Sequence, residues 1–387
     1  MVPRSAEIVI IGAGAVGCSI AYHLARAGQR DVLVLERDAI GAGSTSKAAG
    51  GVRAQFGTEL EIRFSLEGIA FLQRFEEEMG AQCGYVQDGY LLIVTDQKVL
   101  ERSRRNVELQ NRMGVPSRII SPEEAREIAP PLAIGDVLAG VWCPIDGHAA
   151  PNDVCSAYAR RARELGATIL EDTAVTALER TAQHTTRVGT AQGTVEAGTV
   201  VNAAGANARW IARMLGLDAP VAPMRRHIFV TDTIPELARP TPLVIDTGSG
   251  FYARGEHGGL LFSPGDAVEM PDASEPAVDW SVLEGAVDKG VRRFPILERA
   301  AVRSAWAGLR PLTPDEHAIV DWLPGVDGVF CAIGFGGHGF QHSPATGRFV
   351  SEWLTQGKSS VDLSPLSFAR FETLTQTVKA SALSGLA

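Results

Sequence analysis

Short apolar runs and one helical pattern alternate over the first forty residues. Residues 8–11 and 32–35 are continuous apolar runs, and between them apolar side chains recur at helical spacing up to residue 27. Short apolar runs bounded by turn residues are typical of buried strands, and apolar positions three and four apart are typical of a helix. Gly28 follows the helical stretch, where a helix commonly ends. The chain therefore begins with a predicted strand, helix and second strand.

The same kinds of pattern return later in the chain. Apolar positions predict a helix that ends at Gly80, with Ile62, Leu66, Ile69 and Leu72 on one face. Further predicted elements are a strand at 85–95, a capping box at 121–124, a helix and a strand within 151–178, a hairpin at 187–197, and buried strands at 199–205 and 327–333, the last followed by a helix to about residue 354. Residues 221–300 differ, because glycine and proline break their strand-like runs.

Strand–helix alternation near both ends and an antiparallel pattern in the middle predict an α/β chain of two interleaved domains. We expect a Rossmann-type nucleotide-binding domain, assembled from residues 1–84, 141–220 and 301–387. The second, α+β domain, with a mainly antiparallel sheet for the substrate, is expected from residues 85–140 and 221–300.

Composition supports this picture and excludes several classes of protein. The chain has 387 residues, which suits about two domains, and 45% of them are hydrophobic, so disorder is not expected. The formal net charge is −9 without a basic cluster, which argues against nucleic acid as a partner. No run of 18 apolar residues predicts a transmembrane helix, and no signal peptide is expected. Five scattered cysteines without a CxxC pattern indicate a reducing, cytoplasmic location.

The turn after the first strand carries the most specific chemistry. Residues 12–17 read GAGAVG, and Glu36 ends the second apolar run 19 positions after Gly17. In a dinucleotide-binding unit, Gly12 permits the tight turn, Gly14 lets the backbone approach a pyrophosphate, and Gly17 lets the helix pack closely on the strand. The free N–H groups at the helix N-terminus bind phosphate, and Glu36 accepts from a ribose hydroxyl. We therefore predict dinucleotide binding; the alternative is a glycine turn without a ligand.

Five motifs together resemble the FAD-dependent D-amino acid oxidase family, which includes glycine oxidase, the sarcosine oxidases and related dehydrogenases. They are residues 12–17 (GAGAVG), 48–53 (AAGGVR), 200–205 (VVNAAG), 306–311 (WAGLRP) with 313–315 (TPD), and 334–339 (GFGGHG). Residues 50–56 and 313–317 resemble most the branch of glycine oxidase, the sarcosine oxidase β-subunit and proline dehydrogenase. The resemblance covers nearly the whole chain and implies a glutathione reductase-like FAD-binding domain.

The resemblance implies FAD and the residues that hold it. The ADP half is expected on the first glycine turn and Glu36, the loop 41–51 along the pyrophosphate and flavin, and the backbone of Val175 at the adenine. The turn 334–339 precedes a helix, whose dipole can stabilise negative charge at the flavin N1/O2 edge. The expected cofactor-binding residues are Gly12, Gly14, Ala15, Val16, Gly17, Glu36, Arg37, Ser44, Thr45, Lys47, Ala49, Gly50, Gly51, Val175, Ala204, Gly205, Gly308, Arg310, Gly336, Gly337, His338, Gly339, Phe340 and Gln341.

Four side chains are expected to face the substrate. Arg310 corresponds to the arginine that binds the substrate carboxylate in glycine oxidase and its relatives, and a planar guanidinium suits a carboxylate. Tyr252 is expected to donate to the same carboxylate, and Arg53 and His338 to lie at the reactive face of the flavin. The alternatives are structural: a salt bridge for Arg310, a half-buried sheet residue for Tyr252, and no substrate contact for Arg53 or His338.

Departures from the family pattern affect the mode of flavin attachment. Some relatives bind flavin covalently, through a cysteine near the TPD segment or a histidine in the N-terminal loop. Residues 306–321 contain no cysteine and residues 41–51 no histidine, so we expect non-covalent FAD. Gln341 stands where monomeric sarcosine oxidases have a lysine, and residues 258–265 lack a second lysine that promotes reaction with oxygen. The scattered histidines give no metal signature, and no metal is expected.

These observations predict an FAD-dependent enzyme, a dehydrogenase or an oxidase. It would oxidise the C–N bond of a small amino acid or N-alkyl amino acid of the sarcosine, proline, glycine or D-amino acid type. The hydride would go to flavin N5, and the imine would then be hydrolysed. Partners would be the substrate and an electron acceptor or partner subunit. The alternatives are a flavin-carrying subunit or assembly factor with little activity alone, and an NAD(P)-dependent dehydrogenase that uses the same first motif.

Overall fold

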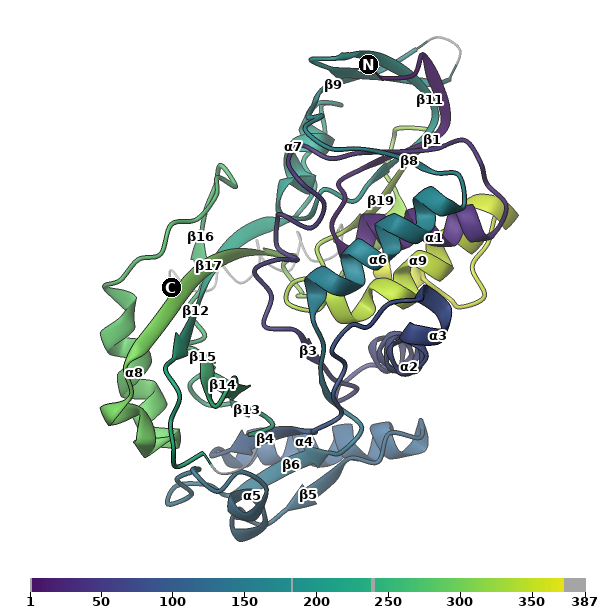
Figure 1. Cartoon of the computed structure of the whole chain (residues 1–387). Helices are drawn as coiled ribbons and strands as arrows, with labels where there is room; N and C mark the ends of the chain where they lie inside the picture. The colour runs from purple at the N-terminus through teal and green to yellow at the C-terminus, as the bar shows by residue number, and fades with distance from the viewer. Residues whose placement is uncertain (1, 182–183, 238–240, 372–387) are drawn as a thin grey trace, which may run out of the picture.

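Two large sheets form the frame of the protein. The computed structural model describes residues 2–181, 184–237 and 241–371. One sheet has eight strands, in the order β18-β19-β11-β1-β2-β8, with β10 and β9 continuing from β11. The other has nine strands, in the order β16-β12-β15-β14-β13-β4-β6-β5, with β17 paired to β12. Figure 1 shows α1, α6 and α9 gathered beside the eight-stranded sheet, and α8 at the opposite side of the molecule.

The centre of the eight-stranded sheet is parallel and buried. The parallel neighbours β19, β11, β1, β2 and β8 carry apolar runs, as strands covered on both faces require. The strands are β1 (Ser5–Ile11), β2 (Val32–Leu35), β8 (Thr168–Leu170), β9 (Val175–Arg180), β10 (Thr186–Thr190), β11 (Gly193–Asn202), β18 (Ile319–Trp322) and β19 (Val329–Ile333). Strand β18 is an antiparallel edge.

Helices cover both faces of this sheet. Ile8, Ile10 and Val34 point to the face on which α1, α6 and α9 pack, whereas Val9 and Ile11 point to the face covered by α7 and the β9–β10 hairpin. This follows from the two-residue period of a strand. The helices of this half are α1 (Ala15–Arg26), α2 (Glu59–Gln73), α3 (Phe75–Met79), α6 (Pro151–Glu164), α7 (Ala208–Arg213) and α9 (Gly339–Gln356).

The nine-stranded sheet is antiparallel except for the pair β13–β4. One face packs on α5 and α8 around Phe229, Phe251 and Phe262, and the other carries Ile228 and Tyr252. Its strands are β4 (Tyr90–Val94), β5 (Arg118–Ile120), β6 (Ala139–Cys143), β12 (Ala222–Thr231), β13 (Leu243–Asp246), β14 (Tyr252–Glu256), β15 (Gly259–Ser263), β16 (Val268–Glu269) and β17 (Val302–Leu312), with helices α4 (Gln97–Arg112), α5 (Pro122–Ile128) and α8 (Val282–Arg293). A separate pair joins β3 (Gly51–Val52) to β7 (Gly147–His148).

Most predicted elements are present, and the differences have local causes. The capping box is confirmed, because Ser121 and Glu124 bond reciprocally at the start of α5. The helix predicted before Gly80 is interrupted at Arg74, because α2 packs on α9 and α3 packs on α6. The strand predicted at 85–95 begins only at Tyr90, after Gly89 adopts a left-handed φ of 85°. The hairpin at 187–197 and the strand predicted at 199–205 share one long strand, β11.

The α/β fold class with a parallel and a mainly antiparallel sheet is confirmed, whereas the ranges of the two domains stay a prediction. Two strands of the nine-stranded sheet do not follow the predicted division. Strand β6 straddles residue 141, and β17 lies within the predicted nucleotide-binding segment 301–387. Strand β17 therefore joins the two halves. Residues 372–387 of that segment lie outside the described residues.

A buried arginine fastens α8 to the nine-stranded sheet. Arg293 is 4% exposed, and it donates to Asp246, 5% exposed, at 2.8 Å and to Asp136 at 2.8 Å. Arg293→Met should lower the stability by about 3–5 kcal/mol, because a buried carboxylate loses its partner. Arg299→Met is the control, since the pair of Arg299 with Glu236 is exposed. Urea unfolding of the purified protein measures both; equal midpoints for the two variants would contradict this role.

Candidate functional site

One large cavity lies between the two sheets. Its volume is about 870 Å³, and it is lined by the glycine turn, the loop 41–51, β12, β14, β17 and the turn 334–339. The structure brings together every residue predicted to bind cofactor or substrate except Gly17, which lies just outside the lining. From the nucleotide-binding half these are Gly12, Gly14, Ala15, Val16, Glu36, Arg37, Ser44, Thr45, Lys47, Ala49, Gly50, Gly51, Arg53, Val175, Ala204, Gly205, Gly336, Gly337, His338, Gly339, Phe340 and Gln341, and from the antiparallel sheet Tyr252, Gly308 and Arg310. Their individual roles stay predictions.

The glycine turn has no room for side chains. Gly12 has a φ of 105°, and a Cβ on it would lie 2.6 Å from the carbonyl oxygen of Ala203. A Cβ on Gly17 would lie 1.9 Å from the carbonyl oxygen of Gly12. Gly17 therefore acts from outside the cavity, by letting α1 pack on the end of β1. This backbone cradle at a helix N-terminus fits the pyrophosphate of a dinucleotide.

Two side chains hold the cradle in shape. The carboxylate of Glu36 accepts from the backbone N–H of Ala13 at 2.7 Å and from that of Asp38 at 3.0 Å. The hydroxyl of Thr45 accepts from the N–H of Ala15 at 3.0 Å, in the first turn of α1. Glu36 thus has a fixed position at the cavity wall, with a carboxylate able to accept from a ribose.

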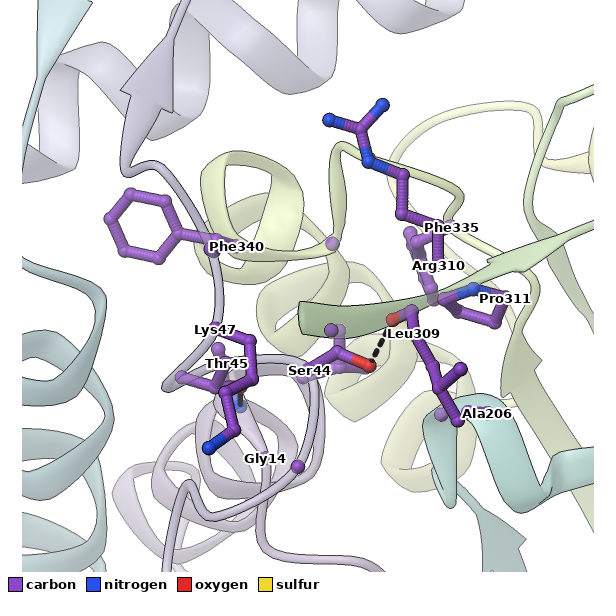
Figure 2. Close-up of a pocket in the computed structure, with 18 of the residues that line it drawn as sticks. Gly14, Ser44, Thr45, Lys47, Ala206, Leu309, Arg310, Pro311, Phe335 and Phe340 are labelled. Atoms are coloured by element: carbon purple, nitrogen blue, oxygen red, sulfur yellow. Dashed lines mark hydrogen bonds between the residues drawn. The ribbon is translucent and has the colours of Figure 1, made fainter. Parts of the chain in front are cut away.

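The loop 41–51 connects the cradle to the antiparallel sheet. Ser44 donates to the carbonyl of Leu309 at 2.6 Å, as Figure 2 shows, and the indole of Trp306 donates to the carbonyl of Lys47 at 3.0 Å. A Cβ on Gly308 would lie 2.5 Å from the Cβ of Lys47. Strand β17 and this loop therefore press directly on one another at the cavity wall.

The turn 334–339 closes the other side of the cavity. It is fixed to β17, because the N–H of Gly336 donates to the carbonyl of Pro311 at 2.9 Å. It leads into α9, whose N-terminus has no side-chain cap. A Cβ on Gly337 would lie 3.1 Å from the guanidinium carbon of Arg310, so this turn and this side chain lie in contact. The free N–H groups and the dipole of α9 suit an anionic ligand edge.

Arg310 extends from β17 beside that turn (Figure 2). Among the described residues it has no carboxylate partner: no hydrogen bond or ion pair joins it to another side chain. The alternative interpretation of Arg310, a structural salt bridge, therefore has no support in the described part of the chain. Tyr252 lies on the same cavity wall, 8% exposed.

Arg53, His338 and Gln341 form a hydrogen-bonded group where α9 begins. Burial, followed by the charge of Arg53, holds the pKa of His338 well below its usual range. His338 is therefore neutral near pH 7, and its Nε2 accepts from the guanidinium of Arg53 at 3.2 Å. Gln341 accepts from the backbone N–H of Arg53 at 2.9 Å. The guanidinium carbon of Arg53 also lies 4.4 Å from the ring centre of Phe56, which fixes its direction.

Sequence reasoning missed several residues of the cavity wall. Arg226 on β12, Tyr90 on β4, Trp210 on α7 and Glu275, which lies 3.7 Å from Lys47, all contribute. Burial raises the pKa of Tyr90, so its hydroxyl stays protonated. The sequence of residues 222–231 does not indicate which face of a strand would carry Arg226 or that this face borders the cavity.

The structure gives no sign of a metal site in the described part of the chain. No group of three or more histidine, cysteine, aspartate or glutamate side chains is placed there to hold a metal ion. All five cysteines are buried and free.

None of the helices in the described ranges combines the length and the apolar character needed to cross a bilayer.

The fit at Gly17 predicts a sharp difference between two glycine variants in helices. Gly17→Ala places a methyl group against the Gly12 carbonyl, so FAD binding should weaken about 10- to 100-fold. Gly285→Ala is the control, because a Cβ at Gly285 in α8 meets nothing within 4 Å. It should retain FAD and gain roughly 0.5–1 kcal/mol of stability. Visible absorbance after gel filtration measures FAD retention; equal retention in both variants would refute the tight-cradle interpretation.

Comparison with known proteins gives relatives that include two mitochondrial dehydrogenases. Rat mitochondrial dimethylglycine dehydrogenase is 34% identical over 391 residues, which cover 96% of this chain and 45% of that protein. Mouse mitochondrial sarcosine dehydrogenase is 29% identical, over 95% of this chain and 42% of that protein. The chain thus spans less than half the length of these relatives.

Solved structures match over nearly their whole length. The structure of L-proline dehydrogenase from P. horikoshii has a TM-score of 0.89 at 33% identity. The match covers 96% of this chain and 99% of that one. Glycine oxidase from Geobacillus kaustophilus has a TM-score of 0.83 at 25% identity, with 94% of this chain and 98% of that one. The family described as FAD-dependent oxidoreductase (DAO) matches residues 7–353, which rules out the NAD(P)-dependent alternative. The chain belongs to this family of FAD-dependent oxidoreductases.

Proposed function

We propose that this enzyme oxidises the C–N bond of a small amino acid or N-alkyl amino acid whose carboxylate binds to Arg310. The guanidinium of Arg310 carries the proposal, because it lines the cavity without a carboxylate partner among the described residues and lies against the turn 334–339. The names of the relatives support this class of substrate, since they are dehydrogenases of dimethylglycine, sarcosine and proline and an oxidase of glycine.

The cavity residues fit the cofactor of the family. The glycine turn, Glu36, Thr45 and the loop 41–51 would hold the nucleotide half of FAD, and the turn 334–339 with the N-terminus of α9 would face the flavin. When bound, FAD supplies the hydride acceptor for the oxidation.

Arg310 binds and orients the substrate. Its planar fork holds a carboxylate through two parallel hydrogen bonds, which fixes the direction of the attached α-carbon. Tyr252 lies on β14 of the same sheet and also lines the cavity, so its hydroxyl can donate to the same group. Holding the α-carbon in one orientation lowers the entropic part of the barrier.

The surrounding charges decide the protonation state of the substrate amine. Arg53, Arg226 and Arg310 line the cavity, and His338 is neutral and occupied by Arg53. Guanidinium groups disfavour a further cation nearby, so they lower the pKa of a bound amine. The cavity therefore selects the neutral amine, whose lone pair is free, and needs no strong general base.

Two finer points remain proposals. A partner subunit or external electron acceptor would take the electrons from the cofactor, and turnover by the purified chain alone separates this enzyme from a flavin-carrying subunit of a larger complex. The cytoplasmic location also stays a prediction.

Arg310 variants test the carboxylate contact. Arg310→Ala should cost about 2–4 kcal/mol of transition-state binding in kcat/KM while FAD is retained, because a charge-assisted pair is lost. Arg310→Lys should recover only part of this loss. Arg303→Ala, an exposed position on the same strand, is the control. Normal kinetics with amino acids in both Arg310 variants would mean that the substrate carboxylate binds elsewhere.

FAD should be released completely by acid precipitation of the yellow protein. Among the described residues that line the cavity there is no cysteine, and its one histidine, His338, already accepts from Arg53. The described lining therefore offers neither a cysteine nor a free histidine, the two attachment residues of the covalent relatives. The test compares the absorbance of the supernatant and the pellet; colour that stays in the pellet would show covalent attachment.

The pH dependence of kcat/KM should show no ionisation that belongs to a histidine of the protein. Because the pKa of His338 lies well below its usual range, its imidazole stays neutral above pH 6. The value of kcat/KM should rise with pH until the free substrate amine is deprotonated, whereas kcat stays flat. Steady-state rates from pH 6 to pH 10 measure this. An ionisation between pH 6 and pH 8 that disappears in His338→Gln would contradict a neutral His338.

A further inference from the structure

We propose that the substrate carries a second carboxylate, which binds to Arg226, so that the cavity takes an amino or imino dicarboxylate. This inference rests on the proposed function, because Arg310 would hold the carboxylate next to the reacting C–N bond. Arg226 then adds a specificity that a single guanidinium does not provide.

Strand pairing places the two arginines on one face of the sheet. In the β12–β17 pair, Arg226 stands opposite Gly308 and Met224 stands opposite Arg310. Arg226 and Arg310 are therefore diagonal neighbours, and such positions lie about 7–8 Å apart, within reach of long side chains. Both line the cavity. Gly308, between them in register, contributes no side chain that would separate the two guanidinium groups.

Arg226 has no close carboxylate partner in the described part of the chain. Its Nε is buried without a hydrogen-bond partner, and no ion pair joins its guanidinium to a described carboxylate. Burial and then the charge of Arg310 lower its pKa, which places the two cations in each other's field. Asp266, just before β16, and Glu316 act on Arg226 only through their charge, without an ion pair, and Asp266 is bound to His227 at 2.6 Å. Two half-buried guanidinium groups of like charge without a paired carboxylate are unfavourable, and a dianionic ligand offsets that cost.

The acidic residues of the cavity do not serve this purpose. Glu36 is held by backbone N–H groups in the nucleotide-binding half, where Asp38 pairs with Arg37 at 2.9 Å. Glu275 lies 3.7 Å from Lys47. The substrate wall of the cavity, as far as the structure describes it, thus carries Arg53, Arg226 and Arg310 and no carboxylate.

Arg225 shows what a structural arginine looks like in the same strand. It points to the opposite face of β12 and forms an ion pair with Asp279 at 3.2 Å. It does not line the cavity. Arg225 and Arg226 are therefore neighbours in sequence with the same charge and opposite surroundings, which makes Arg225→Gln a matched control for Arg226→Gln.

Binding of inert thioethers to the FAD-loaded protein tests the inference without turnover. Thiodiacetate has two carboxylates and (methylthio)acetate has one, and neither has an amine to oxidise. Perturbation of the flavin absorbance gives both dissociation constants. We expect thiodiacetate to bind about 10- to 100-fold more tightly to the wild-type protein, as one additional charge-assisted contact provides. Arg226→Gln should abolish this preference, and Arg225→Gln should keep it.

Turnover then distinguishes the kind of dicarboxylate. Iminodiacetate carries both carboxylates next to the nitrogen, N-methylaspartate carries the second on a side chain, and sarcosine has none. A higher kcat/KM for either dicarboxylate than for sarcosine, lost in Arg226→Gln, supports the proposal and identifies the arrangement.

Three results would overturn it. Equal thioether affinities in the wild-type protein would show that Arg226 binds no second carboxylate, and this comparison needs no variant. Loss of FAD in both Arg226→Gln and Arg226→Lys would assign Arg226 to the cofactor. Oxidation of sarcosine without any preference for dicarboxylates would reject the inference and leave the proposed function intact, whereas failure of every amino acid to reduce the flavin would reject the proposed function.

Discussion

The loop of residues 41–51 is the part of the molecule on which the site depends, because its hydrogen bonds join two sheets that do not pair with one another. Thr45 binds the first turn of α1, and Ser44 binds Leu309 on β17. Further along, Trp306 donates to the carbonyl of Lys47, and Arg254 on β14 donates to the carbonyl of Ala49 at 3.1 Å. The loop therefore sets the distance between a nucleotide cradle on one side and a substrate wall on the other. Small residues dominate the loop because its backbone forms the cavity surface.

The cavity has two ends with different electrostatics. At the nucleotide end, Glu36 and the N-terminus of α1 present an acceptor and a ring of N–H donors. At the substrate end, three guanidinium groups and the N-terminus of α9 create a positive field without a described carboxylate to balance it. A field of this sign attracts an anion, orients it and disfavours protonation of a nearby amine. Binding, orientation and control of the amine thus follow from one distribution of charge.

What the sequence revealed was local, and what it hid depended on contacts between distant segments. The turn with Gly12, Gly17 and Glu36 was readable because strand, turn, helix and acidic residue lie within about thirty residues and each has a fixed geometric task. The family resemblance added Arg310 and the turn 334–339. Arg226 stayed hidden because strand alternation gives two faces and does not say which one borders the cavity. The interruption at Arg74 stayed hidden because the apolar spacing continues through it while α2 and α3 choose different partners.

The central claim is that the substrate end of the cavity selects a ligand by its negative charge. The most direct measurement compares (methylthio)acetate with (methylthio)acetamide, which have nearly the same shape and differ in one charge. Both are titrated into the FAD-loaded protein at low and high salt, and the flavin absorbance is followed. The account predicts that the carboxylate binds about 10- to 100-fold more tightly than the amide, as one charge-assisted contact provides, because the uncompensated guanidinium of Arg310 faces it. Equal affinities for the two ligands would contradict it.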